Sequence, residues 1–163
     1  MRIAMIGAGA MGAMYGARFA RAGAEVILFD IDADHVAAIR ERGLVVRDPD
    51  GEATHRLAAT DAIDDLGPVD LAVVMVDGNA SKAVAAMLAG ALPAEAFAMT
   101  MQNGIGNIEA LVDALGAGRV VGGTTYNSAA RLAPGKVLHS NVGETTIGEL
   151  DGSASDRLAA IAG

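Results

Sequence analysis

The chain has 163 residues, of which 52% are hydrophobic, and its formal net charge at pH 7 is −8. This length suits one domain with a full hydrophobic core, while the acidic balance and the 3% content of aromatic residues argue against nucleic-acid binding. The lack of cysteine excludes disulfides, thiolate metal sites and cysteine nucleophiles. A cytoplasmic enzyme is the simplest interpretation, and no uninterrupted apolar run predicts a transmembrane helix.

The residue order at the start of the chain predicts a strand, a glycine-rich turn, a helix and a second strand. The apolar run 3–6 leads into the spacing G-x-G-x-x-G at residues 7–12, followed by a helical pattern to residue 22 and an apolar run at 26–29. This is the fingerprint of a dinucleotide-binding βαβ unit. We expect the whole turn to contact the cofactor, that is, Gly7, Ala8, Gly9, Ala10, Met11 and Gly12.

Each conspicuous residue of the fingerprint has a physical role. Gly7 permits the tight turn, Gly9 allows close approach of a pyrophosphate, and Gly12 lets the helix pack against the strand. The helix N-terminus directs free N–H groups toward the phosphates. Asp30 lies 18 residues after Gly12, where a carboxylate binds ribose hydroxyls and repels a 2′-phosphate, so NAD is favoured over NADP. Flavin proteins share this opening, so FAD remains an alternative.

The middle of the chain predicts a second helix, a hairpin and a buried strand. Asp32 or Asp34 caps a helix that ends at Gly43, and the hairpin strands 44–47 and 54–58 flank a Pro-Asp-Gly turn. Residues 61–66 form a short helix or turn, and 71–76 form a strand buried on both faces. Ligands of open α/β sheets bind at carboxyl ends of strands. Val76 and Asp77 are therefore expected to contact the cofactor.

The second half predicts further alternation of helix and strand. The expected elements are a helix at 81–91, a strand at 97–101, a helix at 107–115, a strand at 119–125, an antiparallel pair at 136–140 and 145–147, and a helix at 153–162. The predicted fold is α/β, with a doubly wound, mainly parallel sheet of Rossmann type and a terminal antiparallel hairpin.

Three stretches together resemble the N-terminal domain of ketopantoate reductases and related 2-oxo acid reductases. They are MRIAMIGAGAMG at the start, MQNGIGN at 101–107 and GGTTYNSAARLAPGKVLHSNVGETTIGE at 122–149. The resemblance implies hydride transfer between a nicotinamide cofactor and a 2-oxo acid, and a helical domain that this chain lacks. We therefore expect a cofactor-binding domain at 1–150 and, at 151–163, the start of an interrupted helix leading to that domain. It also implies a possible homodimer.

Asn103 is the residue to which the resemblance assigns a place beside nicotinamide and substrate, and we treat it as the candidate catalytic residue. It follows a strand, and its amide can both donate and accept a hydrogen bond. The alternative for Asn103-Gly104 is an ordinary turn.

The chain departs from the family pattern at positions that bear on specificity and catalysis. Relatives usually carry Lys at the end of the fourth apolar strand and an aromatic residue two positions later, where this chain has Asp77 and Asn79. They often carry a basic residue where this chain has Asp30. Both differences favour NAD and place ketopantoate itself in question. Neither Lys82 nor Lys136 matches the family's catalytic lysine motif.

The same residues bear on other functions. The lack of a visible general acid leaves a second hypothesis, a stand-alone nucleotide-binding or sensing module without catalysis. The histidines at 35, 55 and 139 lack metal-ligand spacing, so no metal site is predicted. His139 fits an ordinary strand position, and Thr125 could either contact ligand or serve the strand.

Overall fold

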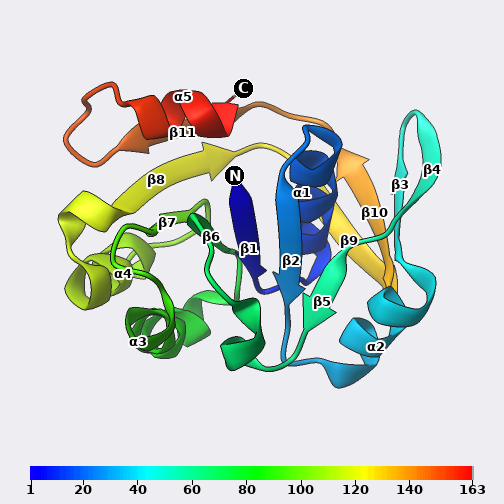
Figure 1. Ribbon diagram of the computed structural model, residues 1–163. Helices are drawn as coiled ribbons and strands as arrows, with labels where there is room; N and C mark the ends of the chain where they lie inside the picture. Colours follow the sequence, from blue (N-terminus) through cyan, green and yellow to red (C-terminus); the bar gives the residue numbers. More distant parts are fainter. Residues whose placement is uncertain (163) are drawn as a thin grey trace.

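The computed structural model describes residues 1–162 as a two-sheet α/β structure (Figure 1). In chain order the elements are β1 (Arg2–Ile6), α1 (Ala10–Arg21), β2 (Glu25–Phe29), α2 (Ala33–Arg42), β3 (Leu44–Asp48), β4 (Gly51–His55), β5 (Ala58–Thr60), η1 (Ile63–Leu66), β6 (Leu71–Val74), η2 (Gly78–Ala80), α3 (Ser81–Ala91), β7 (Phe97–Thr100), α4 (Asn107–Leu115), η3 (Ala117–Arg119), β8 (Val120–Thr125), β9 (Ser128–Ala133), β10 (Lys136–Asn141), β11 (Thr145–Glu149) and α5 (Asp156–Ala162).

The larger sheet has seven strands in the order β11-β8-β7-β6-β1-β2-β5. All neighbouring pairs are parallel except β8 with β11, which is antiparallel. The six parallel strands therefore follow the order 3-2-1-4-5-6 of a doubly wound sheet, with the reversal between β1 and β6. This confirms the predicted fold class and puts the topological switch point beside the glycine-rich turn.

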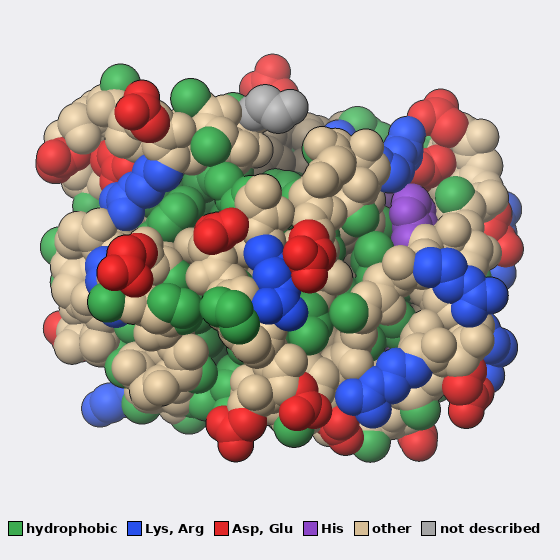
Figure 2. All heavy atoms as spheres, viewed as in Figure 1, with side chains coloured by type: hydrophobic (Ala, Val, Ile, Leu, Met, Phe, Trp, Pro, Cys, Tyr) green, Lys and Arg blue, Asp and Glu red, His purple; other side chains and the backbone are tan. Residues whose placement is uncertain are grey.

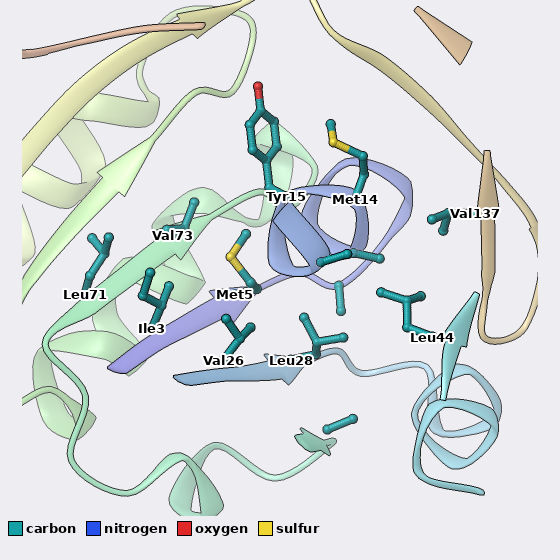
Figure 3. Close-up of a cluster of buried hydrophobic side chains, with 14 of the residues drawn as sticks. Ile3, Met5, Met14, Tyr15, Val26, Leu28, Leu44, Leu71, Val73 and Val137 are labelled. Atoms are coloured by element: carbon teal, nitrogen blue, oxygen red, sulfur yellow. The ribbon is translucent and has the colours of Figure 1, made fainter. Parts of the chain in front are cut away.

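Alternate side chains of the parallel strands supply two hydrophobic cores, one on each face of the sheet. Ile3 and Met5 face α1, whereas Ala4 and Ile6 face the side covered by α3 and α4. Figure 3 shows Met14 and Tyr15 of α1 between the strands of the large sheet and Val137 of β10. The strands are buried on both faces, which explains why their sequences are continuously apolar.

A second sheet of four strands, in the order β4-β3-β10-β9, lies on the α1 side of the molecule (Figure 1). Leu44 of β3 and Val137 of β10 are fully buried against the α1 core, so α1 is enclosed between the two sheets. The predicted turn at 48–51 joins β3 and β4 as an antiparallel hairpin.

The predicted terminal hairpin was wrong in its pairing. β10 pairs with β9 and with β3 in the smaller sheet, whereas β11 pairs with β8 at the edge of the larger one. Strand β9 was not predicted, because Ser128–Ala133 is largely exposed and lacks apolar alternation. The predicted strand 54–58 is also divided: β4 stays in the small sheet and β5 joins the large one.

The end of the described chain packs on the main core. Leu158 and Ile161 of α5 contact the cluster on the α1 face. Arg157 pairs with Glu149 of β11, and this ion pair lowers the pKa of the Glu149 carboxyl. Helix α5 begins at Asp156, three residues later than predicted.

Charged side chains of both signs are interspersed on the face drawn in Figure 2, where lysine and arginine form no continuous basic surface. Among residues 1–162, no helix has both the length and the apolar character that crossing a bilayer demands.

Candidate functional site

The carboxyl ends of β1, β2, β6, β7 and β8 lie along one edge of the large sheet, as parallel pairing requires. Two cavities open there. The first, of about 490 Å³, lies between the ends of β1, β2 and β6. The second, of about 420 Å³, lies beside the ends of β6, β7 and β8. Both are lined in part by Met75 and Val76, so the two cavities adjoin.

The glycine-rich turn has the geometry that its spacing requires. Gly7 has φ +91°, and a Cβ there would lie 2.7 Å from the Val76 side chain. A Cβ on Gly12 would lie 1.9 Å from the Gly7 carbonyl oxygen, so only glycine permits α1 to approach this closely. A Cβ on Gly9, in contrast, would meet no atom within 4 Å. Gly9 therefore faces open space that a ligand can occupy.

The first cavity is mainly apolar and holds two carboxylates at its edge. Its lining comprises Gly7, Gly9, Phe29, Asp30, Ile31, Met75, Val76, Asp77, Ala80, Ala83, Val84 and Met87. Ile31 is 87% exposed although it lines this cavity. Such an exposed apolar surface beside a cavity suits one face of a planar ring system.

The carboxylate of Asp30 is held by the chain that follows it. Its Oδ1 accepts the Asp32 backbone N–H at 3.0 Å, while Oδ2 has no partner among residues 1–162. Asp32 accepts the His35 backbone N–H and pairs with Arg131, and these two contacts lower the pKa of Asp32. The carboxylate of Asp32 thus lies on the loop that follows Asp30, and among residues 1–162 the only ion pair made by either side chain is that of Asp32 with Arg131.

The second cavity is more polar. It is lined by Met11, Met75, Val76, Gly78, Met101, Gln102, Asn103, Thr125, Asn127, Ser128 and Ala129. Asn103 is exposed, and its side-chain amide makes no hydrogen bond within the described part of the chain. It is therefore available to bind a ligand carbonyl or amide.

Gln102 connects the loops around the second cavity. Its Nε2 donates to the Val76 carbonyl at 2.6 Å and to Ser81 Oγ at 3.0 Å. Ser81 Oγ donates to Asn107 Oδ1, and Asn107 Nδ2 donates to the Asn103 backbone carbonyl. The first turns of α3 and α4 are thereby tied to the ends of β6 and β7, which fixes the backbone that carries Asn103.

Asn127 holds together the segments on the β8–β9 side of the second cavity. Its Oδ1 accepts the Gly143 N–H and the Nε2–H of buried His139, at 3.2 and 2.9 Å. Its Nδ2 lies within hydrogen-bond distance of Tyr15, Thr125, Thr145 and Gly143 oxygens. Tyr15 of α1 also bonds both threonines at 2.6 Å. One amide therefore joins α1, the large sheet and the small sheet.

The structure brings most of the sequence-predicted site residues to these cavities. Gly7, Gly9, Asp30, Val76 and Asp77 line the first, and Met11, Val76 and Asn103 line the second. Ala8, Ala10 and Gly12 line neither; Ala8 is fully buried and Gly12 packs on the turn. Their contact with a cofactor stays a prediction, as do the roles of the lining residues.

Gln102 and Asn127 line the second cavity but were not among the residues predicted for the site. Gln102 lies inside the Gln-Asn-Gly run that drew attention to Asn103, so its position after β7 was an available signal. Asn127 lies in the family-like run at 122–149, but nothing around it in the sequence indicates its contacts, because its partners are as far as 112 residues away along the chain.

Neither lysine lies in the two cavities. Lys82 is exposed on α3, and Lys136 Nζ pairs with Glu52 at 2.8 Å in the small sheet. Residues 1–162 also contain no group of three or more histidine or acidic side chains arranged to hold a metal ion.

The fold defines a Rossmann-type domain, and both cavities lie at the carboxyl edge of its sheet, where ligands of such folds bind. The chain belongs to the ketopantoate reductase PanE/ApbA family, whose family model matches residues 3–152.

Individual relatives of this family are named as 2-dehydropantoate 2-reductases. The chain is 37% identical to 2-dehydropantoate 2-reductase of Halobacterium salinarum over 99% of this chain and 54% of the relative. For the enzyme of the same name from Pyrococcus abyssi the identity is 33%, over 91% of this chain and 47% of the relative. The chain thus spans about half the length of the curated relatives it matches.

Solved structures agree with the fold. A 2-dehydropantoate 2-reductase from Geobacter metallireducens superposes with a TM-score of 0.90 at 32% identity, covering 99% of this chain and 54% of that one. A D-mandelate dehydrogenase, solved with NADH and anilino(oxo)acetate, superposes with a TM-score of 0.86 at 25% identity, covering 99% of this chain and 51% of that one.

Proposed function

We propose that this chain is the cofactor-binding part of an oxidoreductase that transfers a hydride between a nicotinamide dinucleotide and a 2-oxo acid or the matching 2-hydroxy acid. The observation that carries the proposal is the pair of adjoining cavities at the carboxyl edge of the sheet. One is apolar with an Asp30 oxygen, and one is polar with the Asn103 amide, and neither group has a partner among residues 1–162. The names of its relatives as 2-dehydropantoate 2-reductases support the same reaction class.

In this proposal the adenosine occupies the first cavity and the nicotinamide the second. Apolar side chains such as Ile31 and Val84 pack against the adenine, and Asp30 Oδ2 accepts a ribose hydroxyl. The open space above Gly9 and the N-terminus of α1 receive the pyrophosphate, because the first N–H groups of a helix lack internal partners.

Asp30 supports a preference for NAD over NADP. A 2′-phosphate beside Asp30 would meet its carboxylate directly, and Asp32 adds a second negative charge two residues away. Arg131 is already engaged with Asp32, which leaves it poorly placed to neutralise a phosphate. The D-mandelate dehydrogenase solved with NADH supports the same choice.

Asn103 orients the reacting groups. The bound nicotinamide supplies or receives the hydride. Asn103 donates to an oxygen or accepts from an amide at the mouth of the second cavity, while Gln102 keeps its backbone in place. No lysine, arginine, histidine or acidic side chain lines this cavity in the described part of the chain. The proton for the alkoxide must therefore come from water or from another segment of the protein.

A small 2-oxo acid is the substrate class that these relatives imply, and ketopantoate is one candidate within it. A cytoplasmic location and a homodimer also stay proposals. The sensing-module alternative is not favoured, because the relatives are named as reductases. A flavin enzyme would be recognised by a yellow preparation with flavin absorbance.

The test is a titration with NADH and NADPH, followed by nicotinamide fluorescence in a chain that contains no tryptophan. The wild type should bind NADH at least about tenfold more tightly than NADPH. Asp30→Ala should weaken NADH binding about tenfold to a hundredfold, because a hydrogen bond to a charged group contributes about 1.5–3 kcal/mol.

The matched control is Asp34→Ala, which removes an exposed carboxylate that lines neither cavity. It should leave both affinities unchanged. Tighter binding of NADPH by the wild type would reverse the assigned preference, and binding of neither nucleotide would refute the proposal.

A further inference from the structure

His35 of α2 is fully buried, yet both of its ring nitrogens make hydrogen bonds to distant segments. Nε2 lies 2.8 Å from the carbonyl oxygen of Ala8, inside the glycine-rich turn. Nδ1 lies 3.0 Å from the backbone nitrogen of Gly135, in the turn between β9 and β10. The imidazole lines neither cavity, so its function is exerted through the two backbones it joins.

The two partners determine which nitrogen carries the proton. A backbone N–H can only donate, so Nδ1 must accept the hydrogen bond from Gly135. In a neutral imidazole the other nitrogen then carries the proton, and Nε2–H donates to the Ala8 carbonyl. A single tautomer satisfies both contacts.

The bond to Ala8 sets the direction of the next N–H group. In a planar trans peptide the carbonyl and the N–H point in opposite directions. Since the Ala8 oxygen points to His35, the Gly9 N–H points away from it. Ala8 is fully buried whereas Gly9 lines the first cavity, and the Gly9 N–H has no acceptor among residues 1–162.

We propose that His35 is a positioning residue: it orients the Ala8–Gly9 peptide so that the Gly9 N–H is presented to the pyrophosphate of the bound dinucleotide. This inference deepens the proposed function and rests on it, because it requires an adenine nucleotide in the first cavity.

The small sheet holds the other side of His35. Gly135 has φ +74°, and a Cβ there would lie 3.0 Å from the Ala38 methyl group, so the turn is packed tightly on α2. Arg131 of β9 pairs with Asp32, whose Oδ1 caps α2 at the His35 N–H. The β9–β10 hairpin therefore fixes the helix and the imidazole together. The position of the Gly9 N–H therefore depends on the small sheet, although none of the described residues that line the first cavity belongs to that sheet.

The experiment compares adenosine, ADP and NADH as ligands, because only the last two carry a diphosphate. His35→Leu removes both hydrogen bonds. It should weaken ADP and NADH about tenfold to a hundredfold, the effect of one charge-assisted hydrogen bond, and leave adenosine within about twofold. His35→Gln retains one donor and one acceptor and should restore most of the diphosphate affinity.

The matched control is Val36→Ala, which opens a cavity at the neighbouring buried position of α2 without removing either hydrogen bond. It should destabilise the fold while changing adenosine and ADP affinity equally. If His35→Leu lowers the affinity for adenosine and for ADP by the same factor, the inference is overturned and the role of His35 is structural.

Two readouts on the wild type remain decisive if His35→Leu does not fold. Imidazole ¹⁵N shifts should show Nδ1 unprotonated and Nε2 protonated, and ADP but not adenosine should shift the Gly9 amide proton. A protonated Nδ1, or a Gly9 amide proton whose chemical shift does not change on addition of ADP, would contradict the inference. If the wild type binds none of adenosine, ADP and NADH, the proposed function is overturned as well.

Discussion

The first cavity is walled by residues that lie between positions 7 and 87, whereas the second takes side chains from Met11 to Ala129. The shape of the first cavity is set mainly by the backbone. Glycines leave the space open, and the strand order brings the lining segments together. In the second, side-chain amides dominate: Gln102 joins the loop after β6 to the end of β7, and Asn127 joins α1 to both sheets. In the proposed cofactor cleft a local motif thus adjoins a long-range polar network, and the two should respond differently to substitution.

The largest effect should follow from breaking the local motif. Gly12→Ala places a methyl group where a Cβ lies 1.9 Å from the Gly7 carbonyl oxygen, so the turn or α1 must move. We expect a loss of roughly 3 kcal/mol or more in unfolding free energy and no measurable NADH binding. Urea unfolding and fluorescence titration would measure the two.

Gly9→Ala is the control, since its Cβ meets nothing within 4 Å. It should fold with nearly unchanged stability and still lose NADH affinity, because the methyl group enters the space assigned to the pyrophosphate. Equal stability losses in both variants would contradict this account of the turn.

Removing the centre of the long-range network should be the next largest effect. Asn127→Leu leaves the buried His139 Nε2–H and the Gly143 backbone groups without their partner. We expect a loss of about 3 kcal/mol in unfolding free energy, from several unsatisfied polar groups. Asn141→Ala, which removes one exposed bond to Tyr126, should cost less than about 1 kcal/mol. Similar losses in both would show that the network adds no more stability than one exposed hydrogen bond.

Asn103→Ala should separate binding from stability. The amide is exposed and unpaired within residues 1–162, so the unfolding free energy should change by less than about 0.5 kcal/mol. NADH affinity should fall about tenfold while adenosine affinity is unchanged, since only the nicotinamide reaches the second cavity in our proposal. Asn79→Ala, in the neighbouring helix η2, is the matched control and should change neither. An Asn103→Ala variant with full NADH affinity would remove this residue from the site.

The smallest effect concerns Arg131 and Asp32. Because the Asp32 pKa is lowered from an ordinary value near 3.8, its contribution to stability is complete above that pH and is lost as the pH falls through the folded-state value. Arg131→Met should thus be slightly less stable than the wild type at pH 7, and the difference should vanish in strong acid. Urea unfolding at pH 7 and near pH 2 would measure this, with the exposed Arg47→Met as control. A difference that grows in acid would contradict the assignment.

The sequence allowed the parallel sheet and the first cavity to be predicted because their information is local. The spacing of Gly7, Gly9 and Gly12 and the continuous apolar strands each impose a geometry that neighbouring residues alone determine. The family resemblance added Asn103, whose chemistry could not be inferred from a turn-forming Asn-Gly dipeptide.

The small sheet and its contacts could not be predicted in the same way. β10 has the apolar alternation of a strand, but nothing in it specifies β3, some ninety residues earlier, as a parallel partner. His35 reads locally as a residue of the first turn of α2, and its partners Ala8 and Gly135 become visible only when the chain is folded. Long-range hydrogen bonds leave no periodic pattern in the sequence. The predicted pairing of the terminal strands was therefore wrong.

The most direct test of the central claim is a comparison of amide shifts on adding adenosine and then NADH to ¹⁵N-labelled protein. Adenosine should shift amides of the first cavity, such as Asp30 and Val84, and leave the Asn103 side-chain amide unchanged. NADH should shift both sets, including Asn103 and Asn127. If NADH leaves the second cavity unperturbed, or if adenosine perturbs both cavities alike, the two cavities do not form one dinucleotide cleft.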